Sequence, residues 1–409
     1  MTPPARPRSA GGAIATLRHP HLLALLAAAF LLGNASSFVV PFISLWGTGH
    51  VGMTPFGFGM FMTATSSSSM VLSIAIARWS DTRASRRSVL LLAGTGGVLG
   101  YAGYATVSHP WLLALIGVGF IGLAAASFPQ LFAHAREELA RPDYADCDAP
   151  TTLSVMRAAF ALAWTFGPAI GAMLVQRYGY RGTFGAASAL FAAYVFIVWW
   201  CVPARAPVPK LQDAARTPFW RVLSSPLVLG NFAAFVLVFA AISLNLMNLP
   251  LLLTAELGGT AREVGIAFAV APMVEIPLML WFGRLAARGH QVALIRGGVS
   301  CGVVYFIGLL LAGDPSRVYA LQVLNAAAVA TTMSVAIPYF QDMLPGQTGV
   351  ATSIYANSFS LGSLLGYVSF GVLAPAIGHR NLSLVCAVLG ALSLTVLMLS
   401  PRRELTPAA

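Results

Sequence analysis

The stretch "LVLGNFAAFVLVFAAISLNLMNLPLLL", residues 227–253, contains no charged side chain. A helix rises about 1.5 Å per residue, so about 20 apolar residues cover the hydrocarbon core of a bilayer, which is about 30 Å thick. A soluble protein that exposed such a stretch would present a large apolar patch and aggregate. Residues 227–253 are therefore predicted to form a transmembrane helix.

The rest of the chain repeats this pattern. Of its 409 residues, 57% are hydrophobic and 9% are charged, whereas about 25% of the residues in an average soluble domain are charged. Helices are expected, because a membrane barrel would need short alternating strands. The predicted fold class is an all-α membrane protein with twelve transmembrane helices. Their approximate bounds are 20–45, 55–77, 88–107, 110–133, 151–176, 182–202, 227–253, 263–286, 291–312, 317–340, 348–374 and 381–400.

The positions of the basic residues predict the topology. With the N-terminus in the cytoplasm, nineteen of the 24 Lys and Arg residues fall on the inner side, as expected for cytoplasmic loops. Both termini are therefore predicted to be cytoplasmic. The net charge of +11 is spread over helix ends instead of forming one stripe, which argues against a nucleic-acid partner. The four cysteines lack metal-ligand spacing, and we expect neither a metal nor a cofactor.

The chain is predicted to consist of two similar halves. Residues 203–226 are Pro-rich and basic, and they are interpreted as a cytoplasmic linker between a six-helix half, 1–202, and a second six-helix half, 227–409. Pro129 in "SFPQLF" and Pro338 in "AIPYFQ" are 209 positions apart, as are Pro41 and Pro250, and other matches fall at nearly the same offset. Paired six-helix halves are typical of transporters that give alternating access to a central site.

The loop after the second apolar run, "ARWSDTRASRRS" (77–88), resembles the loop motif of the major facilitator superfamily, G-x-x-x-D-R/K-x-G-R-R. Ala77 and Ser85 stand in place of its glycines. We interpret the charged residues as a latch in which the carboxylate faces a helix N-terminus and the arginines face helix C-termini. Topology alone is the alternative explanation of the arginines. The candidate latch residues are Asp81, Arg83, Arg86 and Arg87.

The fifth run contains "AWTFGPAIGA" (163–172), which resembles the antiporter motif of exporting members of that superfamily, g-x-x-x-G-P-x-x-G-G. Gly167, Pro168 and Gly171 match the motif. Small residues at this spacing let two helices approach closely, and a proline bends a helix. The motif favours export, and simple tight packing is the alternative.

A finer resemblance covers nearly the whole chain. The stretches "FPQLFAHAREEL", "NLPLLLTAELG" and "YFQDMLPGQTGVATSIYANS" are similar to the bacterial sugar efflux transporters. The resemblance implies a protein of the bacterial inner membrane that exports lactose, glucose or related glycosides in exchange for protons. Its expected partners are a sugar, protons and the lipid bilayer, and we expect a monomer without enzymatic activity. A multidrug exporter of the same superfamily is the alternative.

The stretch "AVAPMVEIPLML" (269–280) places a carboxylate inside an apolar run. Glu275 alone among the 13 acidic residues falls near the middle of a predicted span. An ionised group there costs about 2.5–3.5 kcal/mol, so it must face a cavity or a partner, or be protonated. Pro272 and Pro277 lack an N–H and leave two carbonyls without their helical donors. Glu275 is therefore a candidate for proton coupling or sugar binding, and a bridge between helices is the alternative.

Other polar or aromatic side chains in the spans are candidate sugar contacts. A carboxamide offers donors and an acceptor to sugar hydroxyls, although it can equally join two helices. Arg157, about two turns into the fifth span, is expected to snorkel or to pair with Glu137 or Asp81, and a role in a cavity near Glu275 is the alternative. The candidate substrate-binding residues are Asn34, Trp164, Asn245, Asn248, Gln322, Asn325 and Asn357.

Overall fold

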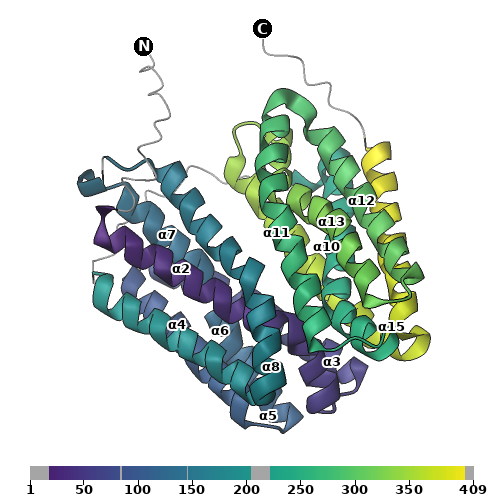
Figure 1. The fold of residues 1–409 in the computed structure, drawn as a ribbon. Coiled ribbons are helices and arrows are strands. Elements are labelled where there is room, and N and C mark those ends of the chain that lie inside the picture. The colour runs from purple at the N-terminus through teal and green to yellow at the C-terminus, as the bar shows by residue number, and fades with distance from the viewer. Residues whose placement is uncertain (1–17, 83–84, 145, 204–221, 401–409) are drawn as a thin grey trace. The chain divides into compact units, whose positions relative to one another are not determined.

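A computed structural model describes residues 18–82, 85–144, 146–203 and 222–400, and this part of the chain is helical without any β-strand (Figure 1). The longer helices are α2 (Pro20–Val39), α3 (Pro55–Thr82), α4 (Arg86–Thr106), α7 (Ser127–Leu139), α8 (Ala149–Cys201), α10 (Pro226–Leu251), α11 (Ala261–Leu285), α12 (Gln291–Leu311), α13 (Pro315–Ser334) and α15 (Thr348–Leu399). The shorter segments are η1 (Val40–Phe42), η2 (Leu45–His50), α5 (Pro110–Ile116), η3 (Gly117–Ile121), α6 (Gly122–Ala124), η4 (Pro142–Tyr144), η5 (Leu252–Glu256), η6 (Ala286–His290) and α14 (Ala336–Met343).

The helical stretches are consistent with the predicted twelve spans. Among the described residues, nine continuous helical stretches are long and apolar enough to cross a membrane. Three of them, α8, α15 and the stretch Ala261–Leu311, have 51 to 53 residues each. Each of the three bends at a glycine with positive φ, a conformation that glycine adopts without a steric penalty, and these are Gly179, Gly289 and Gly378. Each of these stretches is long enough for two spans, and the all-α fold class is confirmed.

Prolines and capping side chains mark where the helices begin. A proline lies in the first turn of α2, α8, α10 and α13, where the missing N–H is no loss. Asp148 accepts the backbone N–H of Thr151 at 3.0 Å at the start of α8. Thr260 and Glu263 form a capping box on α11. These contacts satisfy backbone donors that would otherwise be left unpaired at helix ends.

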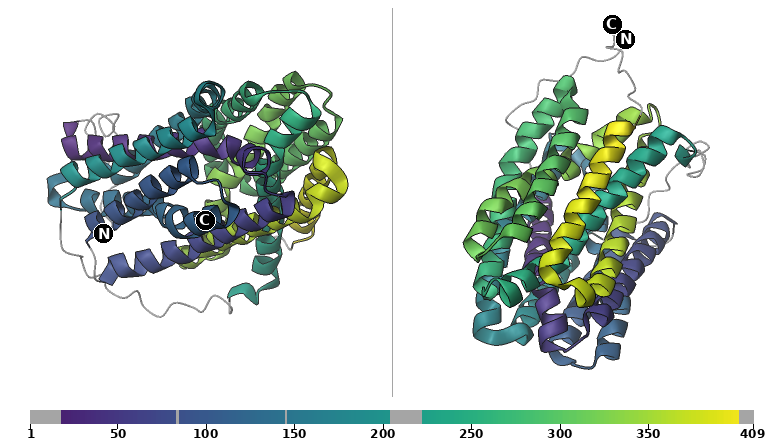
Figure 2. Two further views of the ribbon diagram at one scale, coloured as in Figure 1. Left: turned by 90° about the horizontal axis from the view of Figure 1, so that it is seen from below. Right: turned by 90° about the vertical axis from the view of Figure 1, so that its right-hand side faces the viewer.

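The chain divides into two compact units. The first unit comprises Met1–Val40 and Ser67–Lys210, and the second comprises Pro41–Ser66 and Leu211–Ala409. Within each unit the long helices run alongside one another (Figures 1 and 2). Most of the predicted linker, 204–221, lies outside the described residues.

Residues 41–66 pack against α15 within the second unit. The rings of Phe58 and Phe370 meet edge to face with their centroids 6.0 Å apart. A Cβ atom added to Gly59 would lie 2.7 Å from the Gly371 Cα, so only glycine allows the two backbones to come this close. The first part of α3 therefore belongs to the second unit and its last part to the first.

The most extensive helix pairings are α2 with α8 in the first unit and α10 with α15 in the second. Hydrogen bonds join both pairs, from the Ser37 hydroxyl to the Ala163 carbonyl at 3.1 Å and between the Ser243 and Ser363 hydroxyls at 3.0 Å. In lipid, where apolar surfaces gain little by meeting one another, close packing and such bonds are what hold helices together.

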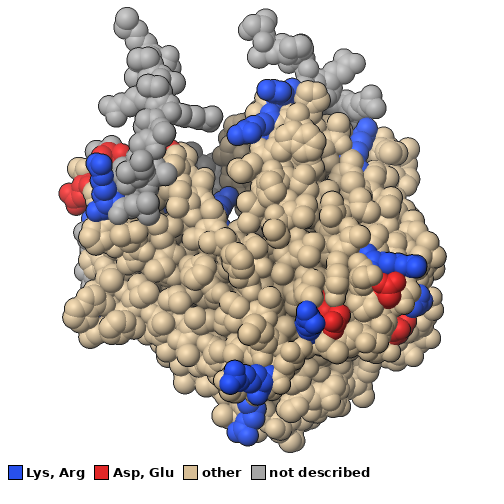
Figure 3. All heavy atoms as spheres, in the orientation of Figure 1, with Lys and Arg blue, Asp and Glu red and all other residues tan. Residues whose placement is uncertain are grey.

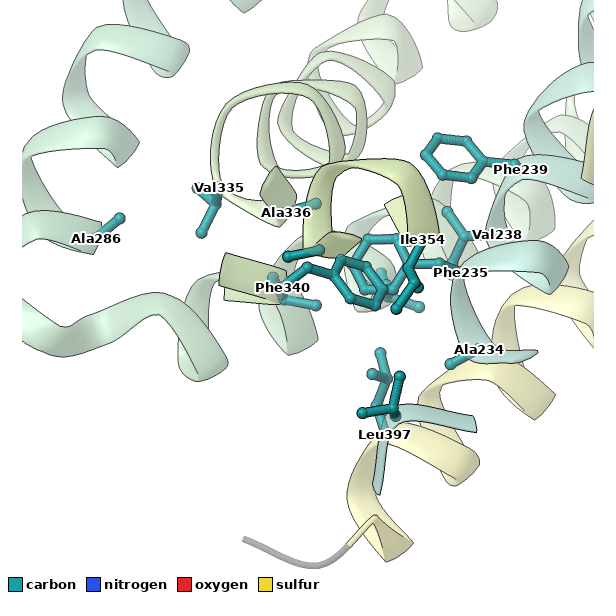
Figure 4. Close-up of a cluster of buried hydrophobic side chains, with 14 of the residues drawn as sticks. Ala234, Phe235, Val238, Phe239, Ala286, Val335, Ala336, Phe340, Ile354 and Leu397 are labelled. Carbon is teal, nitrogen blue, oxygen red and sulfur yellow. The ribbon is translucent and has the colours of Figure 1, made fainter. Parts of the chain in front are cut away.

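A cluster of buried hydrophobic side chains packs α10, α14 and α15 together in the second unit (Figure 4). The ring centroids of Phe235 and Phe340 are 5.1 Å apart, and both side chains are fully buried. Ile354 and Leu397 from the two ends of α15 belong to the same cluster. It joins the beginning of α10 to both ends of α15.

The exposed surface is apolar along the helices. On the face in Figure 3, charged side chains lie near helix ends, and the wide area between them carries almost none. Large apolar side chains are exposed on several helices, among them Trp111, Trp200 and Leu399. Such a surface is suited to contact with lipid tails, and the protein is a multi-pass membrane protein.

Candidate functional site

Glu275 lies on α11 between Pro272 and Pro277, and α11 continues as a helix through both prolines. Its side chain is half-buried. In the described part of the chain, no hydrogen bond and no ion pair reaches its carboxylate. The interhelical bridge that is the alternative role for this residue has no partner within the described residues.

Two of the predicted amide residues meet at a tyrosine, and a third joins them through one of the two. The Tyr305 hydroxyl on α12 accepts the Asn245 side-chain N–H from α10 at 3.3 Å and the Gln322 side-chain N–H from α13 at 3.2 Å. Asn325 extends this network by donating to the Gln322 side-chain oxygen at 2.8 Å. The four side chains form a polar network across three helices of the second unit.

This network leaves one polar atom without a partner. Asn245 is 7% exposed, and its side-chain oxygen is buried without a hydrogen bond in the described part of the chain. Turning the carboxamide over would give the oxygen a donor but would leave the nitrogen unpaired instead. One hydrogen-bonding position of Asn245 is therefore unsatisfied, at a cost of about 1–3 kcal/mol if nothing binds there.

Two other predicted amides have partners in the protein. Asn248 donates to the His379 carbonyl at 2.8 Å, and its oxygen lies 2.9 Å from the His379 ring nitrogen, so it ties α10 to α15. Asn34 donates to the Phe30 carbonyl of its own helix at 2.9 Å. Asn248 thus makes the contact between two helices that is the alternative role of a carboxamide, and both residues stay predictions as sugar contacts.

Trp164 and Asn357 are half-buried on α8 and α15. Neither forms a hydrogen bond or a ring contact with another side chain in the described residues. Their polar or aromatic groups remain available to a ligand.

The candidate latch residues that the structure describes, Arg86 and Arg87, hold helix ends together. The Arg86 side chain, 11% exposed, forms an ion pair with Glu137 of α7 at 2.6 Å. Its guanidinium also donates to Ser80 of α3 and Gln130 of α7, both at 2.8 Å. Arg86 therefore joins α3, α4 and α7 through side chains.

Arg87 makes the predicted contact between an arginine and a helix C-terminus. Arg87 donates to the Trp199 carbonyl in the last turn of α8 at 2.5 Å. Arg83 lies outside the described residues, as does the side chain of Asp81.

Arg157 is exposed, and its guanidinium lies over the ring of Phe132 with 5.9 Å to the centroid. The carboxylate of Glu137, one of its predicted partners, is bonded to Arg86 instead. In the described part of the chain, Arg157 forms no ion pair.

The motif of the fifth span packs against α2. A Cβ atom on Gly167 would lie 1.8 Å from the Ser37 hydroxyl oxygen, so the two helices touch at this glycine. Pro168 and Gly171 are buried on the same helix. These contacts match the close packing that either interpretation of the motif requires.

One group of side chains in the described residues is arranged as metal ligands could be. The ligand atoms of His19, Asp146 and Cys147 lie within 4.8 Å of one another. The His19 ring nitrogen is 3.1 Å from each Asp146 oxygen, and this hydrogen bond holds the pKa of the Asp146 carboxyl below its usual value. The Asp146 carboxylate thus already has His19 as its hydrogen-bond partner.

Sequence reasoning missed Tyr305. It lies in the run "CGVVYFIGLL" (301–310), where a tyrosine looks like one more large apolar residue. A buried Tyr hydroxyl needs a hydrogen-bond partner, and this was the available signal.

Comparisons with known proteins agree on one family. The family model described as Major Facilitator Superfamily matches residues 25–319 and, in a second match, residues 232–409. A Deinococcus radiodurans protein provisionally named as a sugar efflux transporter is 33% identical over 94% of this chain and 99% of its own. Sugar efflux transporter A of Dickeya chrysanthemi is 31% identical over 86% of this chain and 88% of its own. Sugar efflux transporter A of Escherichia coli K12 is 29% identical over 91% and 94%.

Solved structures agree on the fold. The nucleoside transporter NupG matches with a TM-score of 0.77 at 13% identity, over 93% of this chain and 98% of its own. A bacterial homologue of the human lysosomal transporter Spinster, in an inward-facing and occupied conformation, matches with a TM-score of 0.74 at 12% identity, over 93% and 96%. At these identities the likeness concerns the fold alone.

Proposed function

We propose that this protein exports a sugar across the bacterial inner membrane. The chain belongs to the Major Facilitator Superfamily and within it to the sugar efflux transporters. Export uses alternating access, and the protein works as a monomer with both termini in the cytoplasm. The excess of basic residues on the predicted inner side supports this orientation. The names of the relatives support a sugar as the substrate.

The unsatisfied amide of Asn245 is the observation that carries the choice of substrate. Sugar hydroxyls both donate and accept, so one of them can take the unpaired position of Asn245 in either orientation of the amide. Asn325 and Tyr305 add further polar groups to the same network. A lipophilic drug would leave the Asn245 position unpaired, which favours a sugar over the multidrug alternative.

Glu275 is proposed as the proton-binding residue of an antiporter. A carboxylate without a partner is costly inside a membrane helix, whereas its protonated form is neutral and tolerated there. Binding and release of a proton therefore change the stability of the site by several kcal/mol. Such a difference can couple a proton gradient to a change between two states of the transporter.

Transport by inside-out vesicles tests both the sugar substrate and the proposed role of Glu275. With an acidic lumen and labelled lactose outside, wild-type vesicles should accumulate lactose, and Glu275→Gln vesicles should not, although they retain lactose exchange. Asp342→Asn is the matched control, because the Asp342 carboxylate is held at a helix end by Gln291 at 2.8 Å, and it should transport normally.

Each departure from this result has a distinct meaning. Gradient-driven uptake that survives in Glu275→Gln would place coupling elsewhere. Loss of exchange as well would make Glu275 a sugar contact or a structural residue. Lipophilic cations transported by the wild type in place of lactose would support the multidrug alternative.

A further inference from the structure

A pocket of about 430 Å³ lies in the first unit between α7 and the beginning of α8. Its volume is within the range of about 300–1,000 Å³ that is typical of small-molecule sites. The proposed export mechanism makes no use of it. The pocket is lined by Phe132, Ala133, Arg136, Glu137, Leu153 and Arg157.

The pocket carries an excess of positive charge. The Glu137 carboxylate accepts from Arg86 Nε at 3.0 Å and from Arg86 Nη2 at 2.6 Å, so its charge is already compensated. The neighbouring Glu138 is buried in a separate ion pair. Arg136 and Arg157 are exposed, and neither forms an ion pair in the described part of the chain. Two guanidinium groups therefore remain uncompensated at one small pocket.

The walls of the pocket orient one of these groups and offer an apolar surface. The Arg157 guanidinium is placed by its contact with the face of Phe132, 5.9 Å from the ring centroid. A guanidinium presents a planar fork of N–H donors that matches the oxygens of a phosphate. Phe132 and Leu153 can contact the carbon skeleton of a ligand whose anionic group lies on the arginines.

We propose that this pocket binds a phosphorylated small molecule of monosaccharide size. The phosphate lies between Arg136 and Arg157, and the carbon skeleton lies against Phe132. A phosphate monoester carries nearly two negative charges at neutral pH, which matches the two uncompensated arginines. The phosphate of a lipid headgroup has the same chemistry, and the experiment separates the two sources. The proposal is independent of which substrate is exported.

Calorimetric titration of the purified full-length protein in phospholipid-free detergent tests the proposal. Glucose 6-phosphate should bind at least about tenfold more tightly than glucose, and its affinity should fall as the salt concentration rises. The variants Arg136→Gln and Arg157→Gln should each weaken this binding by about tenfold or more, because each loses charge-assisted hydrogen bonds. Arg177→Gln is the control, since Arg177 is an exposed arginine of α8 that contacts Tyr178, outside the pocket.

Several results would overturn the proposal. Equal affinities for glucose and glucose 6-phosphate would overturn it, and so would binding at wild-type affinity by both arginine variants. Titration in phosphatidylcholine nanodiscs with and without phosphatidylglycerol identifies the source. Binding of glucose 6-phosphate that persists in both kinds of nanodisc supports a soluble ligand. Loss of binding in phosphatidylglycerol nanodiscs alone supports the phosphate site with lipid as a competitor, whereas no binding in detergent or nanodiscs overturns it.

Discussion

The two units share arginine contacts at their helix ends but differ in the polar groups within their helices. In the first unit Arg87 donates to the Trp199 carbonyl at 2.5 Å, and in the second Arg296 donates to the Leu397 carbonyl at 2.6 Å. Arg87 and Arg296 are 209 positions apart, the offset that relates the two halves of the sequence. The repeat therefore includes side-chain contacts as well as the order of helices.

A second pair of contacts repeats at the opposite ends of the same helices. Arg181 donates to the Ala105 carbonyl at 3.1 Å, and Arg380 donates to the Leu310 and Ala312 carbonyls at 3.2 and 3.0 Å. All of these carbonyls lie at helix C-termini, where backbone oxygens lack partners and the helix dipole is negative. These arginines stabilise helix C-termini in both units.

Polar groups within the spans do not repeat in this way. At the offset of 209, the residues corresponding to Asn245, Glu275 and Gln322 are Ser36, Ser66 and Leu113, and none of these is an acid or an amide. A group needed only to build the six-helix bundle would be expected in both units. The difference supports a functional role for the unmatched groups of the second unit.

The largest effect on stability is expected when the ion pair of the first unit is broken. Arg86→Gln removes the partner of Glu137 and the bonds to Ser80 and Gln130. The loss should lower the free energy of unfolding by about 3 kcal/mol, because one partner of a largely buried pair is left uncompensated. Thermal unfolding of the purified protein in detergent measures the change.

The double variant Arg86→Gln with Glu137→Gln is the control for this prediction. It leaves no uncompensated charge, so it should be less destabilised than the sum of the single variants. Additive losses would show that the two side chains act independently, and the comparison between paired and unpaired charges would fail.

Close contacts between helices should give the next largest effect. A Cβ atom at Gly366 would lie 2.6 Å from the Ala240 carbonyl oxygen of α10, and backbone cannot move aside as a side chain can. Gly366→Ala should therefore lower the free energy of unfolding by about 2 kcal/mol. Gly297→Ala on α12 is the matched control, because nothing lies within 4 Å of its added methyl group. The control should be neutral or slightly stabilising, and equal losses in both variants would contradict the packing argument.

Much of this fold could be predicted from sequence, because membrane helices depend on local composition. The apolar runs gave the spans, and the resemblance to sugar efflux transporters is confirmed by relatives at 29–33% identity. Glu275 could be singled out because a lone carboxylate inside an apolar run is conspicuous without any structure.

The partners of the polar side chains could not be predicted in the same way. The meeting of Asn245, Tyr305 and Gln322 depends on the rotation of three helices about their axes, which composition does not determine. The sequence leaves topology and a latch as two explanations of the arginines near helix ends. Their contact with particular carbonyls depends on which helices are neighbours. Tertiary packing thus determines the hydrogen-bond partner of each amide.

The repeated arginines should give smaller and equal effects in the two units. Arg87→Gln and Arg296→Gln each remove a charged donor from a helix C-terminus, at an expected cost of about 1 kcal/mol. Thermal unfolding should show similar shifts for both variants. A shift confined to one of them would mean that the two contacts are not equivalent, and the structural repeat would be weaker than the hydrogen bonds suggest.

Glu275→Gln should have the smallest effect on stability, although it is expected to abolish gradient-driven transport. In the described part of the chain no partner loses a hydrogen bond in this change, and the amide is neutral like the protonated acid, so at a pH where Glu275 is protonated the free energy of unfolding should change by less than about 0.5 kcal/mol. Thermal unfolding of the Glu275→Gln and Arg86→Gln variants compares the two losses of stability. A loss as large as that of Arg86→Gln would show that Glu275 has a structural partner. An unchanged unfolding temperature with lost transport would mean that this carboxylate is kept in the membrane for its charge and not for the fold.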